Sequence, residues 1–453
     1  MICTAAWRVD MPTSVIVWDV MFLGCLYFCI RKSYFELTVR FIYDRIVPQL
    51  PYILAIESSC DETAAAIVQG GERLVSSVVA SQIATHQPYG GVVPELASRE
   101  HLRNIVPVVH GALEKASMTL DQIDALAVTK GPGLAGALLV GVSYAKALAY
   151  ATGKPLIAVN HLEGHIHAVL LEQRQAGNHD LQFPVLALVV SGGHTHLYLA
   201  EQVGDKEADP LTTHDLQLTA GGKVQPHLSW SYRNIGHTRD DAAGEAFDKV
   251  AKLLGLGYPG GPIIDGLARF GDPKAVHFPI TQLKHADRRP TGPRKVAVSG
   301  ARFDFSYSGI KTAVLRYVET HDMLEAIERR RAALLQLRAP VLDDYRRVCD
   351  QPTLDLVASF QRAIVDDLVT KTLEAARATA TATLLVTGGV AANTELRETF
   401  EERAAQDGFP VYFPSRRLST DNAAMIAAAA YPKWLTKTFA DMDVSGEATL
   451  PLR

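Results

Sequence analysis

The chain has 453 residues, of which 48% are hydrophobic and 21% are charged. A chain of this length and apolar content is too long for one small core and too apolar for intrinsic disorder, so we expect a globular protein of two or three domains. The formal net charge of −4 provides no overall attraction for nucleic acid, so any RNA contact must use a local basic patch or a partner.

The first fifty residues, 1–50, form a hydrophobic extension. Residues 14–30 are apolar except for Asp19, a stretch of about one bilayer span, but a charge near its centre costs roughly 3 kcal/mol. A membrane anchor, a leader, a poor signal peptide and upstream sequence from a wrongly assigned start codon all stay open, and the membrane is the less favoured of these. The five scattered cysteines include no C-x-x-C pair, which favours a reducing cytoplasm.

From residue 52 onward, short β-like runs alternate with helical patterns, which indicates an α/β protein with a largely parallel sheet. Two segments depart from this alternation, because residues 53–68 and 184–200 each have the pattern of strand, tight turn and strand. The first turn is predicted over residues 58–63, and the second contains a Gly-Gly pair. Such turns expose backbone N–H groups that can hold an oxyanion, so the repetition indicates two related halves built for phosphate binding.

The remaining patterns predict further elements in chain order. Between the hairpins we expect a helix near 98–116, a strand over 124–129, a helix to 150 and a strand near 156–159. After the second hairpin come a polar stretch (201–241), a helix from 242 and a Pro-rich basic loop near 284–295. A helix over 354–379 is predicted to bury one stripe of side chains, namely Leu356, Phe360, Ile364 and Leu368.

His161 and His165 form the first candidate for chemistry. Two imidazoles four residues apart on a helix lie on one face, at a separation suited to a single metal ion. Glu163 falls on another helix face, so the general base of a zinc protease would be misplaced and a metallopeptidase is disfavoured. Taken alone, incidental histidines on a surface helix are the simpler interpretation.

Glycine-rich turns form a second group. They contain Gly131 and Gly133, Gly192 and Gly193, Gly260 and Gly261, and Gly388 and Gly389. Each permits close approach of the backbone to a ligand, although any one of them is more often an ordinary turn. Together they favour a nucleotide-like ligand, while the absence of P-loop and Rossmann motifs disfavours those two binding modes.

Several carboxylates are further candidates. Asp61 and Glu62 at the first hairpin tip could supply a general base or orient a second metal, although acidic turn residues are more often simply solvated. Asp248 follows other acidic residues at the start of a helix, where the helix dipole alone would favour them. Asp421 precedes an Ala-rich helix, so it is either close to the helix N-cap or the carboxylate that would complete a metal site.

Together these segments closely resemble the tRNA N6-adenosine threonylcarbamoyltransferase family, formerly described as O-sialoglycoprotein endopeptidases or glycoproteases, and its bacterial-type members in particular. The matching segments are IESSCDET, GGVVPELASREH, GPGLAGALLVG, NHLEGHIHA, VVSGGHTH, DDAAGEAFDKVAKLLGLGYPGGPIID, FSYSGIKTAV, TGGVAANTELR and TDNAAMIAAAA. The resemblance implies the two-lobed ASKHA fold of actin, Hsp70 and sugar kinases, with a duplicated core and a cleft between the lobes.

The resemblance also implies a domain division. The first lobe is expected over 51–170 and the second over 171–415, with insertions near 218–235 and 321–350, before a C-terminal segment (416–453) whose helix returns to the first lobe. For the arginines of the second insertion we favour solvation over an RNA-binding role; these are Arg329, Arg330, Arg331, Arg338, Arg346 and Arg347.

The site residues are carried over from the family in the same way. The resemblance implies one divalent metal ion per subunit, iron (Fe2+) in preference to Zn2+, held by His161, His165 and Asp421. It implies contacts with the substrate from Val189, Val190, Ser191, Gly192, Gly193, Asp248, Gly261, Asp265 and Asn393, and we expect Asp248 and Asp265 to hold ribose hydroxyls. We expect Asp61 or Glu62 to remove a proton from the attacking amine.

The implied reaction is acyl transfer. N6 of adenosine 37, in tRNAs that read codons beginning with A, attacks the carbamoyl carbon of threonylcarbamoyl-AMP, and AMP leaves. Bacterial relatives act with a pseudo-enzyme paralogue and a P-loop ATPase, in the cytoplasm and without DNA. A metallopeptidase and a non-catalytic ASKHA scaffold are the alternatives. One departure is Ser419, where the family usually has cysteine.

Overall fold

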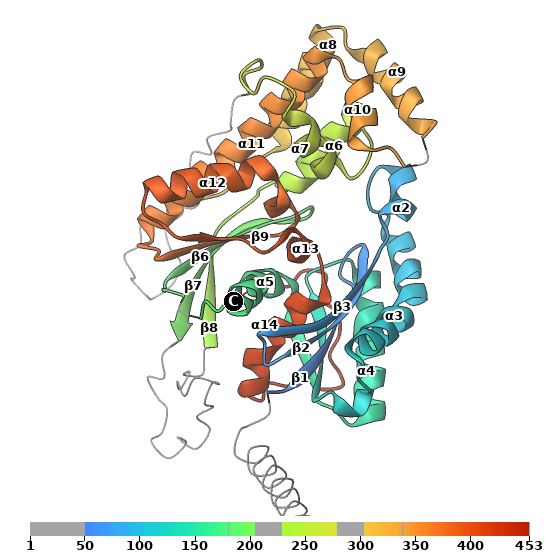
Figure 1. Ribbon diagram of the computed structural model, residues 1–453, viewed down its shortest axis with the longest axis vertical. Coiled ribbons are helices and arrows are strands. Elements are labelled where there is room, and N and C mark those ends of the chain that lie inside the picture. Colours follow the sequence, from blue (N-terminus) through green and yellow to red (C-terminus); the bar gives the residue numbers. More distant parts are fainter. Residues whose placement is uncertain (1–49, 180, 204–228, 279–302, 338, 453) are drawn as a thin grey trace, which may run out of the picture. The chain divides into compact units, whose positions relative to one another are not determined.

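The computed structural model describes residues 50–179, 181–203, 229–278, 303–337 and 339–452 (Figure 1). The predicted N-terminal hydrophobic span, the basic loop near 284–295 and residues 218–228 of the first expected insertion lie outside these ranges. The described residues from 51 onward belong to one unit of the chain.

The first sheet has five strands in the order β3-β2-β1-β4-β5. They are β1 (Tyr52–Glu57), β2 (Glu62–Gln69), β3 (Arg73–Ser81), β4 (Ala125–Gly131) and β5 (Leu156–Asn160). The first three strands are antiparallel, and β1, β4 and β5 are parallel. The predicted first hairpin is confirmed, with a tip two residues shorter than expected because Glu62 and Thr63 already pair with β3.

The second sheet repeats this arrangement, in the order β8-β7-β6-β9-β10. Its strands are β6 (Val185–Val190), β7 (Thr195–Val203), β8 (Ser229–His237), β9 (Thr383–Thr387) and β10 (Val411–Tyr412). As in the first sheet, three strands are antiparallel and two are added in parallel. The predicted duplicated α/β core of the ASKHA fold is therefore confirmed.

Strand β8 corrects the expected polar stretch over residues 201–241. Residues 229–237 pair along β7 as the counterpart of β3, so the part of the expected insertion from residue 229 to 235 belongs to the duplicated core. Tyr232 and Ile235 are buried although their neighbours in sequence are polar. An edge strand with one solvated face has few apolar residues, which explains why composition alone missed it.

Helices cover both faces of the first sheet (Figure 1). Leu54 and Ile56 pack against α3 (Pro94–Ala116) and α4 (Ala135–Thr152), whereas Ile53 and Ala55 pack against α14 (Ala423–Leu435). Helix α3 begins four residues before the predicted start because Pro94 occupies its first turn, where proline is favoured. Within the described ranges, α4 alone has the length and composition of a membrane span, and its buried residues pack in the first-sheet core.

Helix α5 (His161–Gln175) packs against the cores of both sheets. Ala168 and Leu171 join the cluster of α14 and the first sheet, whereas Leu162 and Ile166 pack against β6 of the second. The helix that carries the histidine pair therefore connects the two halves of the duplicated core (Figure 1).

The opposite face of the second sheet is covered by α6 (Ala243–Leu253), α7 (Gly260–Ala268), α8 (Ser308–Thr320), α11 (Gln351–Ala378) and α12 (Thr394–Gln406). The predicted stripe on α11 is confirmed, since all four of its side chains are buried there. Short elements complete the chain: α2 (Ile83–His86), α13 (Arg416–Ser419) and the 3₁₀ turns Gln87–Tyr89, Leu120–Gln122 and Gly389–Ala392.

The second expected insertion forms α9 (Leu324–Leu335) and α10 (Leu342–Val348). The solvation expected for its arginines holds for Arg329, which is exposed beside Glu325, but is wrong for Arg330. Arg330 is 1% exposed and donates to the Leu254 carbonyl at 2.5 Å and to Thr353 Oγ1 at 2.6 Å. These hydrogen bonds offset the cost of burying the positive charge of Arg330. Arg338 lies outside the described residues.

Candidate metal centre and substrate loops

The histidine pair lies at the start of α5. The Asn160 side chain accepts a hydrogen bond from the Leu162 amide at 2.9 Å, which starts the helix directly after β5. His161 and His165 therefore occupy consecutive turns, and their ring centroids are 4.7 Å apart. Both side chains are buried, so the interpretation as incidental surface histidines is wrong.

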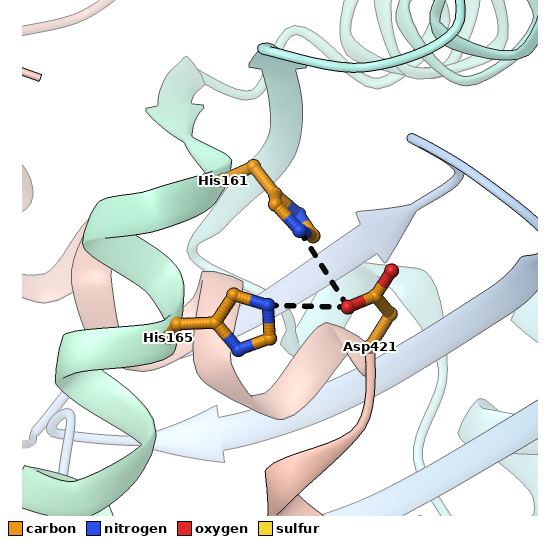
Figure 2. Close-up of side chains that lie close together, drawn as sticks. All are labelled: His161, His165 and Asp421. Atoms are coloured by element: carbon orange, nitrogen blue, oxygen red, sulfur yellow. Dashed lines mark ion pairs between the residues drawn. The ribbon is translucent and has the colours of Figure 1, made fainter. Parts of the chain in front are cut away.

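Asp421 faces this pair from the loop between α13 and α14. Its Oδ1 lies 3.5 Å from Nε2 of His161 and 3.2 Å from Nε2 of His165 (Figure 2). The N-cap of α14 is Asn422, whose side chain accepts from the Met425 amide at 3.0 Å. Asp421 is therefore not the helix cap, and its carboxylate is directed at the two imidazoles.

The three side chains fit a divalent metal ion. One ligand atom from each lies within 4.8 Å of the others, and an ion with bonds of roughly 2.0–2.2 Å needs ligand atoms only a few ångströms apart. Neither ring nitrogen of buried His165 makes a hydrogen bond among the described residues, and its Nε2 faces the Asp421 carboxylate at 3.2 Å, so one cation could be coordinated by both groups. Two imidazoles and one carboxylate suit iron or zinc and leave coordination positions open.

The charges at this centre are strongly coupled. Burial alone would lower the pKa of His161, but the carboxylates of Asp421 and Glu57 raise it to about 9. Burial raises the pKa of Asp421, and His161 more than reverses this, so that Asp421 stays ionised. Burial lowers the pKa of His165. The electrostatics of the centre therefore favour one positive charge, either a proton on His161 or a cation in its place.

Glu57 lies behind His161 and was not identified from the sequence. Its Oε2 is 3.2 Å from Nδ1 of His161 and accepts from Thr129 Oγ1 at 2.6 Å, while its Oε1 accepts from the Ser59 amide at 2.6 Å. A carboxylate that orients a metal-binding histidine through the other ring nitrogen is common in metal sites. The available signal was a carboxylate at the end of an otherwise apolar strand.

The two predicted acidic residues lie at the first hairpin, with Asp61 at the end of the loop after β1 and Glu62 at the start of β2. Glu62 Oε1 accepts from Ser81 Oγ at 2.8 Å, whereas its buried Oε2 has no partner within the described ranges. Burial raises the pKa of Glu62 to about 7. Burial and the charge of Asp421 also raise the pKa of Asp61, whose Oδ2 accepts from the Tyr258 hydroxyl at 3.3 Å.

The glycine turns of the second half follow β6 and β9 and begin α7. Gly388 has a φ of 96°, and a Cβ there would lie 2.3 Å from the carbonyl oxygen of Val190. In contrast, a Cβ at Gly192, Gly193 or Gly261 would meet nothing within 4 Å. Close packing therefore explains Gly388, while the other three glycines leave room for a ligand beside the backbone.

Asp248, Asp265 and Asn393 hold the surrounding turns. Asp248 Oδ1 accepts from the Gly260 amide at 2.7 Å, and burial raises the pKa of this aspartate to about 6. Asp265 accepts from the Thr394 amide and hydroxyl at 3.1 and 2.9 Å. Asn393 caps α12 through the Leu396 amide. The residues implied as ribose ligands thus also fix the turns, and their contact with substrate stays a prediction.

The family model described as tRNA N6-adenosine threonylcarbamoyltransferase matches residues 73–225 and 216–428. The chain belongs to this family.

Relatives that carry the same name as the threonylcarbamoyltransferase family cover most of the chain. One from Koribacter versatilis (strain Ellin345) is 67% identical over 401 residues, 88% of this chain and 99% of the relative. Another, from Syntrophobacter fumaroxidans, is 48% identical over 85% of this chain and 95% of its own length. Among solved structures, full-length HypF is similar at 13% identity and a TM-score of 0.46, over 85% of this chain and 47% of that protein.

Ser419, the departure from the threonylcarbamoyltransferase pattern, is buried beside the loop of Asp421. Its hydroxyl donates to the Ser415 carbonyl at 3.0 Å and accepts from Arg397 at 3.3 Å. The serine therefore stabilises α13, and its hydroxyl is engaged away from the three candidate metal ligands.

Glu163 and His167 lie on the face of α5 opposite the metal ligands, as their two-residue offset from His161 and His165 requires. Glu163 pairs with Lys433 at 2.6 Å, so it is not placed to activate water in this threonylcarbamoyltransferase-family chain. These residues line a cavity of about 600 Å³ that the three candidate metal ligands do not line. A search for cavities alone would therefore have missed the candidate metal centre.

Proposed function

We propose that the chain transfers the threonylcarbamoyl group from threonylcarbamoyl-AMP to N6 of adenosine 37, in tRNAs that read codons beginning with A, forming t6A and releasing AMP. The observation that carries the proposal is the assembly of His161, His165 and Asp421 at one point, beside the first hairpin with its two acidic residues, Asp61 and Glu62. Family membership supports the same activity.

One divalent cation, Fe2+ in preference to Zn2+, would be held by His161, His165 and Asp421. When bound, it would supply Lewis-acid polarisation of the carbonyl group under attack. Glu57 would keep Nδ1 of His161 protonated, so that Nε2 is free to coordinate.

Among the acidic residues, Glu62 is the better candidate for the general base. Its pKa of about 7 balances deprotonation against basicity, and its Oε2 has no partner among the described residues. Asp61 shares its Oδ2 with Tyr258 and would position the loop. The open glycine turns at Gly192, Gly193 and Gly261 would bring backbone N–H groups to the leaving phosphate.

The proposed partners follow the family. The chain would act in the cytoplasm, without a membrane or DNA, together with a pseudo-enzyme paralogue and a P-loop ATPase. The net charge of −4 supports the need for a partner or a local surface in binding tRNA.

The test is transfer of labelled threonine to unmodified tRNA, with a synthase and the partner proteins supplied. We expect wild type to label tRNA, and His161→Ala and Asp421→Ala to lose the label while remaining folded. Matched controls are His110→Ala, an exposed histidine on α3, and Asp443→Ala, an exposed aspartate near the C-terminus. Absence of label with wild type would favour the non-catalytic scaffold.

A further inference from the structure

The loop between β1 and β2 contacts the candidate metal centre through the side chain of Ser59. Residues 58–61 join β1 to β2, and Ser59 Oγ lies 3.1 Å from Nδ1 of His161. Asp61 is the last residue of this loop, and Glu62 is the first residue of β2. Small shifts of this loop therefore change the position of both carboxylates relative to the histidine pair.

Three consecutive carbonyl groups hold the loop, each by a different contact. The Ser59 carbonyl accepts from the Leu134 amide at 2.8 Å, and the Asp61 carbonyl accepts from the Gln82 amide at 3.1 Å. The carbonyl between them, of Cys60, accepts instead from Nε2 of the His101 side chain at 2.9 Å. Only this middle contact depends on the identity of a side chain.

His101 also contacts the other end of the loop. It comes from α3 and is fully buried, and its Nδ1 lies 2.8 Å from the hydroxyl of Thr63. Cys60 and Thr63 flank the two acidic residues. An imidazole has polar atoms at both ends of a rigid ring, so one side chain ties both flanks to the same helix.

The two contacts determine which ring nitrogen of His101 carries the hydrogen. Because a carbonyl only accepts, Nε2 of His101 carries the hydrogen, and Nδ1 accepts from the hydroxyl of Thr63. Burial lowers the pKa of His101, which keeps this neutral form at neutral pH. Both contacts are then satisfied at once.

We infer that His101 is a positioning residue for acyl transfer: by bridging the Cys60 carbonyl and the Thr63 hydroxyl, it sets where Asp61 and Glu62 lie. The inference rests on the proposed function for the catalytic value of that position. His101 touches neither the metal ligands nor the substrate turns by any contact described above. Its loss should therefore lower turnover and leave the metal site intact.

The experiment compares His101→Asn with His110→Asn, the same substitution at an exposed site on the same helix. Single-turnover transfer to tRNA, Zn2+ binding and alkylation of Cys60 by iodoacetamide, followed by peptide mass spectrometry, are measured on the full chain. We expect about a tenfold to hundredfold lower transfer rate for His101→Asn, with unchanged KM and unchanged Zn2+ affinity. We expect Cys60 to react about tenfold faster, while His110→Asn behaves as wild type.

Cys349 provides an internal control because it is also partly buried but lies at the end of α10. Faster alkylation of Cys60 alone supports positioning, whereas equal acceleration of both thiols shows general loosening and overturns it. Thr63→Val removes one of the two contacts of His101 and keeps the shape of the side chain. It should lower the transfer rate less than His101→Asn does. In the double variant, the two effects on the rate should not add fully. Wild-type rates and Cys60 reactivity in both variants would also overturn the inference.

The outcome separates this inference from the proposed function. If Glu62→Gln and Asp61→Asn both keep the wild-type rate, the proposed role of the acidic residues fails, and Cys60 reactivity still decides whether His101 holds the loop. If those two variants are impaired and His101→Asn is not, the positioning role alone fails.

Discussion

Glu57 Oε2 lies 3.2 Å from Nδ1 of His161, and both side chains are almost completely buried. The Glu57 carboxylate links Thr129 to His161, which in turn contacts Asp421. A buried carboxylate at this place stabilises the ring orientation in which Nε2 faces Asp421. The first strand therefore contributes to the centre although it supplies no metal ligand.

Replacing Glu57 should weaken metal binding. Glu57→Gln keeps the shape of the side chain but removes the charge behind His161, and we expect Zn2+ affinity to fall about 10- to 100-fold. Calorimetric titration of the metal-free protein measures the affinity. Glu163→Gln, on the opposite face of the same helix, should leave it unchanged. Equal affinity for wild type and Glu57→Gln would show that the contact does not support the metal site.

The stability of the metal-free protein should fall at alkaline pH. The pKa of His161 is raised from its ordinary value of 6.5 to about 9, so the stabilisation from its proton is fully present below pH 6.5 and is lost as pH rises through 9. That stabilisation is about 3 kcal/mol at most. Thermal unfolding from pH 6 to 10 measures it, with His161→Ala as the comparison. A metal ion that replaces the proton should bind more tightly as pH rises toward 9.

Transfer should show an ionisation near neutral pH that belongs to Glu62. The base acts only when deprotonated, so the single-turnover rate should rise with pH and level off above about 7. We expect Glu62→Gln to lose this rise of the rate with pH and to transfer the group about 10²- to 10⁴-fold more slowly. If the rise of the rate with pH persists in Glu62→Gln and disappears in Asp61→Asn, the base is Asp61.

Two kinds of glycine should respond differently to alanine. Gly388→Ala should destabilise the protein by about 1–3 kcal/mol, because its φ of 96° is strained for alanine and the Cβ would meet the Val190 carbonyl. Gly192→Ala and Gly261→Ala meet open space, so stability should change by less than about 0.5 kcal/mol. Their KM for the adenylate should rise instead. Unchanged kinetics would show that these turns do not approach the substrate.

Local patterns were sufficient for much of the fold. The hairpin of β1 and β2, the buried stripe of α11 and the spacing of His161 and His165 each depend on residues close in sequence, where side-chain periodicity directly reflects local geometry. The family motifs added the duplicated core, which the repeated strand order confirms. Local patterns missed β8, which lies within the expected polar stretch, because an edge strand needs few apolar residues.

Tertiary structure decided the chemistry of individual side chains. By sequence, Asp421 was equally a helix cap or a metal ligand, Arg330 was one of several solvated arginines, and Glu57 and His101 had no assigned role. Each assignment depends on partners far away in the chain, such as Asp421 on α5 and His101 on the loop after β1. Burial and charge are properties of the folded surroundings, so identical residue types acquire different roles only when long-range packing brings their partners within hydrogen-bond distance.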